Sequence, residues 1–177
     1  MIALVTLLDI QDLKYICDSV KNSTSWPQFV SEAQLLDVKP QISDALLNEL
    51  ANEYPTYSVA NQLLMDGGSY VYLSRTYLFQ GLKNCIAYYA FGRFTNRTSF
   101  NYTAAGITIK DSDYSTPASD KHIQRLETEA RLTADAIMCE VITFLNRNKT
   151  SYPLWANSSY GCGSYCSDNR PFKVIGD

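Results

Sequence analysis

The chain has 177 residues, a length that fits one domain with an appreciable apolar core. Apolar residues make up 46% and charged residues 19%, which excludes a chain that is disordered throughout. The net charge of −3 and a pI of about 5.1 argue against a dedicated nucleic-acid binder, and a single histidine, His122, excludes a metal site built from several imidazoles.

The first ten residues, MIALVTLLDI, are apolar, but no basic residue precedes the apolar run. They do not fit a secretory signal, and we expect a strand or an ordered arm. The next stretch, 10–21, places Ile10, Leu13, Ile16 and Val20 on one face of a helix that Asp9 could cap. No run approaches the roughly 20 apolar residues of a membrane span.

Residues 26–54 carry apolar side chains at helical spacing, and Pro40 interrupts them, so we expect two helices or one bent helix. Pro27 suits a first helical turn, with Ser25 as a possible cap. A short helix is predicted over 58–65, followed by a turn at Asp66-Gly67-Gly68.

Residues 69–94 have aromatic and aliphatic side chains at helical spacing and predict a long helix. The polar connection that follows, 95–116, is long for a compact domain, and such loops are usually functional. Within it Gly106 to Ile109 has a strand pattern, so we expect a small hairpin or an extended arm.

A second long helix is predicted over 118–147, with Thr116-Pro117 as its start signal. One apolar stripe runs along it: Ile123, Leu126, Ala130, Ala134, Ile137, Val141, Phe144 and Leu145. After Pro153 the composition changes to Gly, Ser, Asn, Tyr and Cys, which predicts an irregular tail, and residues 172–175 could form a terminal strand.

The predicted fold is therefore mostly α: a helical bundle with two long amphipathic helices joined by a long extended loop and ending in an irregular tail. We divide the chain into a helical domain, 1–155, which includes the loop 96–117, and an extended tail, 156–177.

No catalytic, cofactor or metal site is predicted. His122 sits among charged residues at a helix start, as on a solvated surface. Asp111 and Asp113 begin a calcium-loop pattern that fails at its sixth and twelfth positions, Thr116 and His122.

The five cysteines and the carboxylates of the second long helix are each explained by an ordinary structural role. Cys17, Cys85 and Cys139 fall in helical patterns and are expected to be small buried hydrophobes. Cys162 and Cys166 are too few for zinc; they are either free thiols or a tail disulfide. The carboxylates of the second long helix are expected to be solvated or, if copies lie side by side, to form ion pairs between subunits: Glu127, Glu129, Asp135 and Glu140.

The 13 tyrosines are the unusual feature of the composition. Tyr70 and Tyr89 are expected in the core, whereas aromatic side chains in the loop and tail suit an interface equally well. The residues predicted to contact partners are Tyr102, Thr103, Ile107, Ile109, Tyr114, Trp155, Tyr160, Tyr165 and Phe172.

The order of five segments resembles the head-to-tail connector, or adaptor, proteins of tailed bacteriophages of the crAss-like, Bacteroides-infecting type. The segments are EAQLLDVKPQISDALLNEL (32–50), GLKNCIAYYAFGRF (81–94), TAAGI (103–107), ASDKHI (118–123) and FLNRNKTSYPLW (144–155). The family usually has Gly where this chain has Ser43.

The resemblance implies a small helical protein of the virion, made in the cytoplasm of the host bacterium, that forms a ring at the head–tail junction. Such a ring, commonly of twelve copies, sits beneath the portal protein, docks the next neck or tail component and lets genomic DNA pass through its lumen without sequence-specific binding. It implies no catalysis and no cofactor. By analogy, residues 96–117 and 152–177 would be the contact segments.

Two other classes of function are also compatible with the sequence. A helical DNA-packaging or nucleic-acid-binding accessory protein would require a basic patch, and the 15 Lys and Arg residues are scattered. A small enzyme would depend on His122 or on a tail cysteine such as Cys162.

Overall fold

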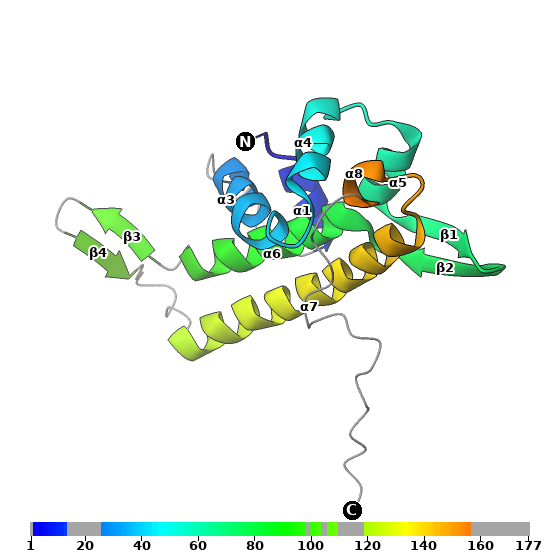
Figure 1. Cartoon of the computed structure of the whole chain (residues 1–177). Coiled ribbons are helices and arrows are strands. Elements are labelled where there is room, and N and C mark those ends of the chain that lie inside the picture. The colour runs from blue at the N-terminus through cyan, green and yellow to red at the C-terminus, as the bar shows by residue number, and fades with distance from the viewer. Residues whose placement is uncertain (1, 14–25, 98–99, 104–105, 110–118, 157–177) are drawn as a thin grey trace, which may run out of the picture.

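The computed structural model describes residues 2–13, 26–97, 100–103, 106–109 and 119–156, with side chains left undescribed over 100–109. Most of these residues are helical, as predicted (Figure 1). In chain order the elements are α1 (Leu7–Leu13), α3 (Trp26–Ala33), the π-helix η1 (Gln34–Val38), α4 (Asp44–Glu53), α5 (Val59–Asp66), β1 (Gly68–Tyr72), β2 (Arg75–Phe79), α6 (Gly81–Arg97), β3 (Phe100–Thr103), β4 (Gly106–Ile109), α7 (Asp120–Arg147) and α8 (Pro153–Ala156).

Helix α6 is the centre of the molecule. It packs along α7 on one side and against α1, α3 and α5 on the other, while α8 closes against α4 (Figure 1). One continuous apolar core results, since buried side chains of all these helices belong to a single cluster. Near the C-terminal end of α6, the aromatic rings of Trp26, Phe29 and Phe94 pack together. The Trp26 ring stacks on the Phe94 ring with the ring centres 4.1 Å apart.

The N-terminal strand prediction is wrong for the described residues. Helix α1 begins at Leu7, and Asp9, expected to lie just outside a helix, is in its first turn. Thr6 and Asp9 form a reciprocal cap, since the Thr6 amide donates to Asp9 Oδ2 at 2.7 Å and the Asp9 amide approaches Thr6 Oγ1 at 3.5 Å. The residues before it are an ordered arm, because the buried Gln34 side chain binds the Leu4 amide and the Ile2 carbonyl, both at 2.9 Å.

The expected break around Pro40 is confirmed, and α3 and α4 are separate helices. Helix α4 begins after Ser43, whose hydroxyl accepts from the Leu46 amide at 3.2 Å and donates to the Leu154 carbonyl at 3.2 Å. Ser43 is therefore both the helix cap and a tie to α8. The short helix predicted over 58–65 is also confirmed as α5, which Ser58 caps through the Asn61 amide.

The long helix predicted over 69–94 is wrong in its first half, where residues 68–79 form the antiparallel hairpin β1–β2. Its two-residue loop, Leu73-Ser74, has positive φ at both positions, 49° and 62°. Positive φ at both positions gives the twist that a two-residue hairpin loop needs. The Asn-Gly pair that usually marks such a loop is absent, so the turn could not be predicted from the sequence. Gly81, with φ of 81°, is the first residue of α6 and turns the chain from the hairpin into that helix.

The second long helix is confirmed as α7, and the hairpin β3–β4 confirms the strand expected at Gly106 to Ile109. Residues 157–177 lie outside the described residues. The predictions of an irregular tail, a terminal strand at 172–175 and a Cys162–Cys166 disulfide therefore concern residues outside the described part of the chain. The prediction for Cys17 does so too, because residues 14–25 are also outside it.

Candidate interaction surfaces

Four of the residues predicted to contact partners belong to the hairpin β3–β4. Tyr102 pairs with Ile107 and Thr103 with Gly106, and Ile109 lies opposite Phe100. The hairpin leaves the body of the protein between α6 and α7, away from the core (Figure 1). The remaining loop and tail candidates lie outside the described residues: Tyr114, Tyr160, Tyr165 and Phe172.

Trp155 corrects the predicted set. Its side chain is only 3% exposed and belongs to the main core cluster. The indole Nε1 donates to Asn146 Oδ1 at 3.2 Å, which ties α8 back to the end of α7. Trp155 therefore packs inside its own chain rather than on an open surface, because the chain turns back after α7 and lays α8 on α4.

One open surface is the outer side of β1–β2, here called the hairpin face and defined by Val71, Leu73 and Leu78. These side chains are 68%, 79% and 81% exposed. Val71 and Leu78 lie on the same side of the sheet, because Val71 pairs with Thr76 and Leu78 pairs with Ser69, and alternate residues of a strand share a side. The helical interpretation of the sequence missed this surface, whose only signal is a pair of short β-prone runs, VYL (71–73) and YLF (77–79), on either side of the polar residues 74–76.

The opposite side of the same hairpin is packed on α7. The Phe79 and Phe144 rings stack at 4.2 Å, and Tyr70 meets Phe144 edge to face at 5.0 Å. Arg147 lies over the Tyr77 ring at 4.2 Å and donates to the Tyr70 hydroxyl at 2.9 Å. The burial of Tyr70 predicted from the sequence is confirmed, and the hairpin face is held in one position by the contacts behind it.

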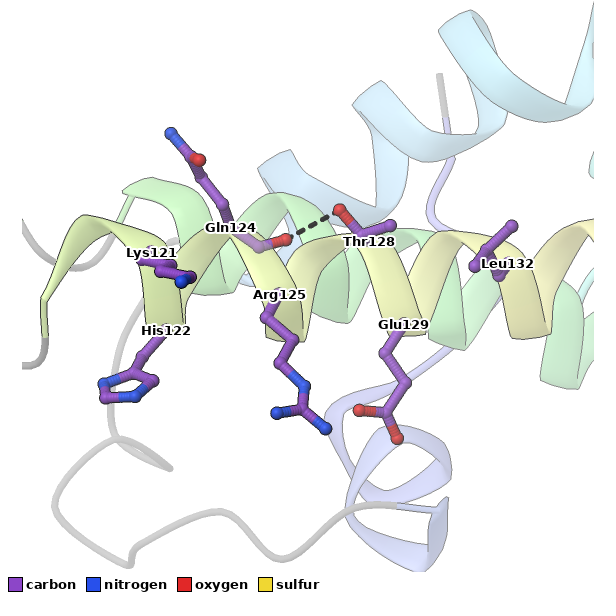
Figure 2. Close-up of a pocket in the computed structure, with 7 residues that line it drawn as sticks. All are labelled: Lys121, His122, Gln124, Arg125, Thr128, Glu129 and Leu132. Carbon is purple, nitrogen blue, oxygen red and sulfur yellow. Dashed lines mark hydrogen bonds between the residues drawn. The ribbon is translucent and has the colours of Figure 1, made fainter.

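A second open surface lies along the first half of α7 (Figure 2). This shallow groove, here called the α7 groove, is lined by Lys121, His122, Gln124, Arg125, Thr128, Glu129 and Leu132. His122, Arg125 and Glu129 project from the same side of the helix in Figure 2. Since every lining residue comes from α7, the groove is the uncovered face of one helix rather than a closed pocket.

The apolar stripe predicted on this helix is confirmed from Ala130 onwards, and of its two earlier members Ile123 is half-buried but Leu126 is not. Leu126 is 50% exposed, while the half-buried positions in this part of α7 include Glu127. One residue is about 100° around a helix, so the inward line passes through Glu127 and leaves Leu126 outside. Leu132, in the groove, is 64% exposed.

Three of the four carboxylates of α7 are exposed, as expected, and Glu127 is half-buried; most of the four also have a partner within the chain. Glu127 binds Arg131 at 3.1 Å, and Glu140 Oε2 accepts from the Gln80 amide at 3.3 Å. Asp135 accepts from the Tyr89 hydroxyl at 2.5 Å, and burial, together with the neighbouring Cys85 and this hydrogen bond, raises the pKa of Tyr89 above its usual range. Glu129 has no such partner among the described residues.

An ion-pair network joins η1, α6 and α7 on the inward side of α7. Arg93 of α6 donates two hydrogen bonds to the Asp37 carboxylate of η1, from Nε to Oδ2 at 2.7 Å and from Nη2 to Oδ1 at 2.9 Å. Arg131 reaches the same carboxylate at 3.4 Å, so three elements meet at Asp37. The two-pronged geometry is the strong form of the pair and ties α6 to η1, while Arg131 adds α7 through a single longer contact.

Among the described residues no three His, Cys, Asp or Glu side chains are placed to hold a metal ion. Cys85 is fully buried, which raises the pKa of its thiol well above the ordinary value, and its Sγ donates to the Ala134 carbonyl at 3.3 Å. His122 is exposed and contacts only the Ser119 hydroxyl, at 3.1 Å, among the described groups. None of the helices that the structure describes is both long and apolar enough to span a bilayer.

A protein family of unknown function, DUF6712, matches residues 38–165, more than two thirds of the chain. The matched region begins at the end of η1 and includes both hairpins and all of α6 and α7. No curated protein and no solved structure matches.

Proposed function

We propose that this chain, which belongs to the DUF6712 family of unknown function, is a non-catalytic structural protein of a bacteriophage virion. In this proposal copies of the chain assemble into a ring at the head–tail junction. The ring extends the DNA channel, binds the portal protein on one side and docks the next neck or tail component on the other. The protein would be made in the cytoplasm of the host bacterium and act in the virion.

The observation that carries the proposal is the pair of unpartnered surfaces at the two ends of α7. The hairpin face presents three large apolar side chains to solvent at one end, and the α7 groove lies uncovered at the other. Exposed apolar side chains gathered on one side of a projecting element mark a surface that another protein covers. The resemblance to connector proteins, carried by the five segments quoted above, adds the ring and its place in the virion.

The finer architecture belongs to this proposal as well. We infer that α6 and α7 act as one two-helix wall, with the connection over 98–119 as the arm that reaches a neighbour or the portal. The hairpin β3–β4 lies in that connection, beyond the ends of both helices (Figure 1). An arm of this kind makes contacts without disturbing the core, since the wall is packed independently of it.

The first test is the native mass of the purified chain, by mass photometry or light scattering. Twelve copies of the 19.9 kDa chain would weigh about 240 kDa, and negative-stain electron microscopy would show a ring of the same particles. Co-assembly with a portal protein is the second test. A chain that remains monomeric both alone and with the portal would contradict the proposal.

Deleting residues 157–177 separates folding from assembly. The truncated chain is expected to keep its helical circular-dichroism signal, because the core cluster lies within residues 4–155, yet to lose co-assembly with the portal. Loss of the helical signal would mean instead that the segment is needed for the fold.

A second candidate is a helical DNA-packaging or nucleic-acid-binding accessory protein. Its support is local: Lys121, His122 and Arg125 gather in the α7 groove. It predicts DNA binding that weakens steeply with salt and is reduced by Arg125→Ala. Salt-insensitive or absent DNA binding would favour the structural role.

A further inference from the structure

We propose that the segment 172–175 of this chain adds as a third strand to the free edge of β1, next to the hairpin face. The inference goes beyond the proposed function and does not depend on it, because the contact lies within one copy of the chain. It names what pairs with one edge of the sheet, and it leaves the apolar side of the hairpin open to a partner.

The free edge of β1 has two residues whose backbone groups point away from β2. Tyr72 and Arg75 flank the two-residue loop and form the hydrogen-bonded pair that closes it. Bonded and non-bonded pairs alternate along an antiparallel ladder, so Tyr70 is the next bonded residue of β1. Ser69 and Val71 are the non-bonded residues, and their N–H and C=O groups therefore face the outer edge.

This edge lacks the features that usually protect an exposed strand. Ser69 and Val71 carry no charge, neither is a proline, and the register of the hairpin contains no bulge. Within the described part of the chain, neither residue makes a backbone hydrogen bond outside the hairpin. Unpaired donors and acceptors in such a row fit an extended peptide segment, because its own backbone repeats the same spacing.

The outer edge of β1 is the more open of the two edges. Strand β2 packs along α7, and Gln80, directly after β2, donates its amide to Glu140 of that helix at 3.3 Å. No helix in the described ranges packs along β1 to the same extent. A third strand therefore meets less obstruction beside β1 than beside β2.

Residues 172–175 suit that edge by their chemistry. Their sequence, FKVI, has three β-prone side chains in four residues, and Pro171 stands just before it, where a strand tolerates proline. The other long stretches outside the described residues differ. Residues 14–25 continue a helical pattern, and residues 110–118 and 157–171 are rich in polar and turn-forming residues.

A third strand with this sequence would widen the hairpin face. Side chains alternate between the two sides of a strand, so Phe172 and Val174 share one side, and Lys173 and Ile175 share the other. Each side therefore carries at least one apolar residue. Whichever side faces outward, it places an apolar side chain in line with Val71.

The segment is within reach of β1 on the same copy. Helix α8 ends at Ala156, and the Tyr152 ring just before it meets Phe144, whose ring contacts Tyr70 of β1 at 5.0 Å. The hairpin is therefore close to the end of the described chain. Residues 157–171 span up to about 50 Å when extended, far more than this separation requires. The entropy of closing a loop grows only slowly with its length.

Amide hydrogen exchange, read by mass spectrometry, tests the contact. The amides of Ser69 and Val71 should exchange at least about tenfold more slowly in the wild type than in Val174→Pro, since proline removes a donor and disrupts the added strand. The amides of Thr76 and Leu78, on the outer edge of β2, should exchange equally in the two chains. A protected β2 edge with an unprotected β1 edge would overturn the assignment.

The control variant is Ser159→Pro. It makes the same substitution in the same terminal part of the chain but outside the segment, and it should keep the slow exchange at Ser69 and Val71. Both variants are expected to fold, because the core cluster lies within residues 4–155. Circular dichroism checks that each variant keeps the helical signal of the wild type.

A mixing experiment identifies which copy supplies the strand. Isotope-labelled Val174→Pro, mixed with excess unlabelled wild type, should keep fast exchange at Ser69 and Val71, because each copy uses its own segment. Slow exchange restored in the labelled chain would overturn the contact within one copy and assign the strand to a neighbouring copy. Equal exchange of these amides in the wild type and in Val174→Pro would overturn the pairing itself. Neither result decides whether a ring forms, which the native mass tests separately.

Discussion

The guanidinium of Arg147 lies 4.2 Å from the centre of the Tyr77 ring and 5.2 Å from that of Tyr72. One residue at the end of α7 thereby holds both strands of the β1–β2 hairpin. A two-stranded hairpin is only marginally stable by itself, so this contact and the aromatic stack behind it decide whether the hairpin exists in the folded protein.

Arg147→Ala is therefore expected to loosen the hairpin. It removes two cation–π contacts and the hydrogen bond to the Tyr70 hydroxyl, and should lower the free energy of unfolding by about 1–3 kcal/mol. Hydrogen exchange should accelerate in β1 and β2 more than in α6. Lys149→Ala, at an exposed position two residues on, is the control and should change neither quantity. Uniform acceleration across α6 would instead assign Arg147 a global role.

The Asp37–Arg93 pair is expected to be the most important ion pair for stability among those in the described residues. Its side chains are only 10% and 13% exposed, so Asp37→Ala leaves a nearly buried guanidinium without its two-pronged partner. We expect a loss of about 3 kcal/mol, at the lower end for buried pairs because Glu32 lies 3.9 Å from Arg93 and compensates in part. The loss in the free energy of unfolding is measured by comparing urea unfolding curves of the wild type and Asp37→Ala.

The control for that pair is Lys39→Ala, which removes the exposed contact to Asp44 at 3.1 Å and should change stability by less than about 1 kcal/mol. Adding Arg93→Leu to Asp37→Ala completes a double-mutant cycle, in which we expect a coupling energy of about 1–3 kcal/mol. A coupling near zero would mean that the two side chains act independently.

Gly81 and Gly92 are expected to respond oppositely to alanine. Gly81 has a φ of 81°, and a Cβ there would lie 2.5 Å from the Met65 carbonyl oxygen, so the backbone of the turn would have to move. Gly92 lies inside α6, where a Cβ would meet the Ala130 Cβ at an ordinary 3.6 Å.

Gly81→Ala should accordingly lower the melting temperature markedly, whereas Gly92→Ala should be neutral or stabilising by up to about 1 kcal/mol, since alanine favours a helix interior. Thermal unfolding by circular dichroism compares them directly. Equal effects of the two substitutions would show that the turn tolerates the shift.

Asp9 makes stability depend on pH at the acid end. Its partial burial raises the pKa, but hydrogen bonds from Lys83 and Thr6 outweigh burial and place the folded-state pKa below the ordinary 3.8. The stabilisation from Asp9 is therefore fully present above about pH 4 and is lost as the pH falls through the folded-state pKa. Lys83, bound to Asp9 at 2.7 Å, has a raised pKa, so its contribution is lost only when the pH rises above 10.5.

Asp9→Asn should thus lower stability at pH 7 and flatten the decline between pH 5 and 2 in urea midpoints. Asp12→Asn, at an exposed position of the same helix, serves as the control and should retain the wild-type profile. Since other carboxylates titrate in the same range, the slope difference between the variants is the informative quantity. An unchanged slope in Asp9→Asn would contradict the prediction.

Periodicity predicted helices wherever one face of the element is buried along its length. Helix α5 and the long helix α7 were found within a few residues of their ends, because their apolar residues recur at the helical period. Pro40 marked the break before α4 for an equally local reason, since proline cannot continue a helix hydrogen-bond ladder.

The sites were less accessible to prediction. The loop and tail residues chosen as contacts rested on composition, and Trp155, chosen with them, is buried because α8 folds back onto α4. The hairpin face and the α7 groove were missed, since exposure depends on which faces other elements cover. Leu126 illustrates the point: its apolar character suited the buried stripe, but packing against α6 placed Glu127 on the inward line instead.

The amino-acid sequence by itself determined the helical character of the chain, most of its helix boundaries and the lack of a recognisable catalytic motif, because these depend on local spacing and residue chemistry. Tertiary structure alone decided that residues 68–79 are a hairpin, since the twist at Leu73-Ser74 is unfavourable locally and is stabilised by Phe144 and Arg147, about 70 residues away in the chain. The same packing decided which apolar side chains stay exposed, because burial requires a covering element and not a pattern.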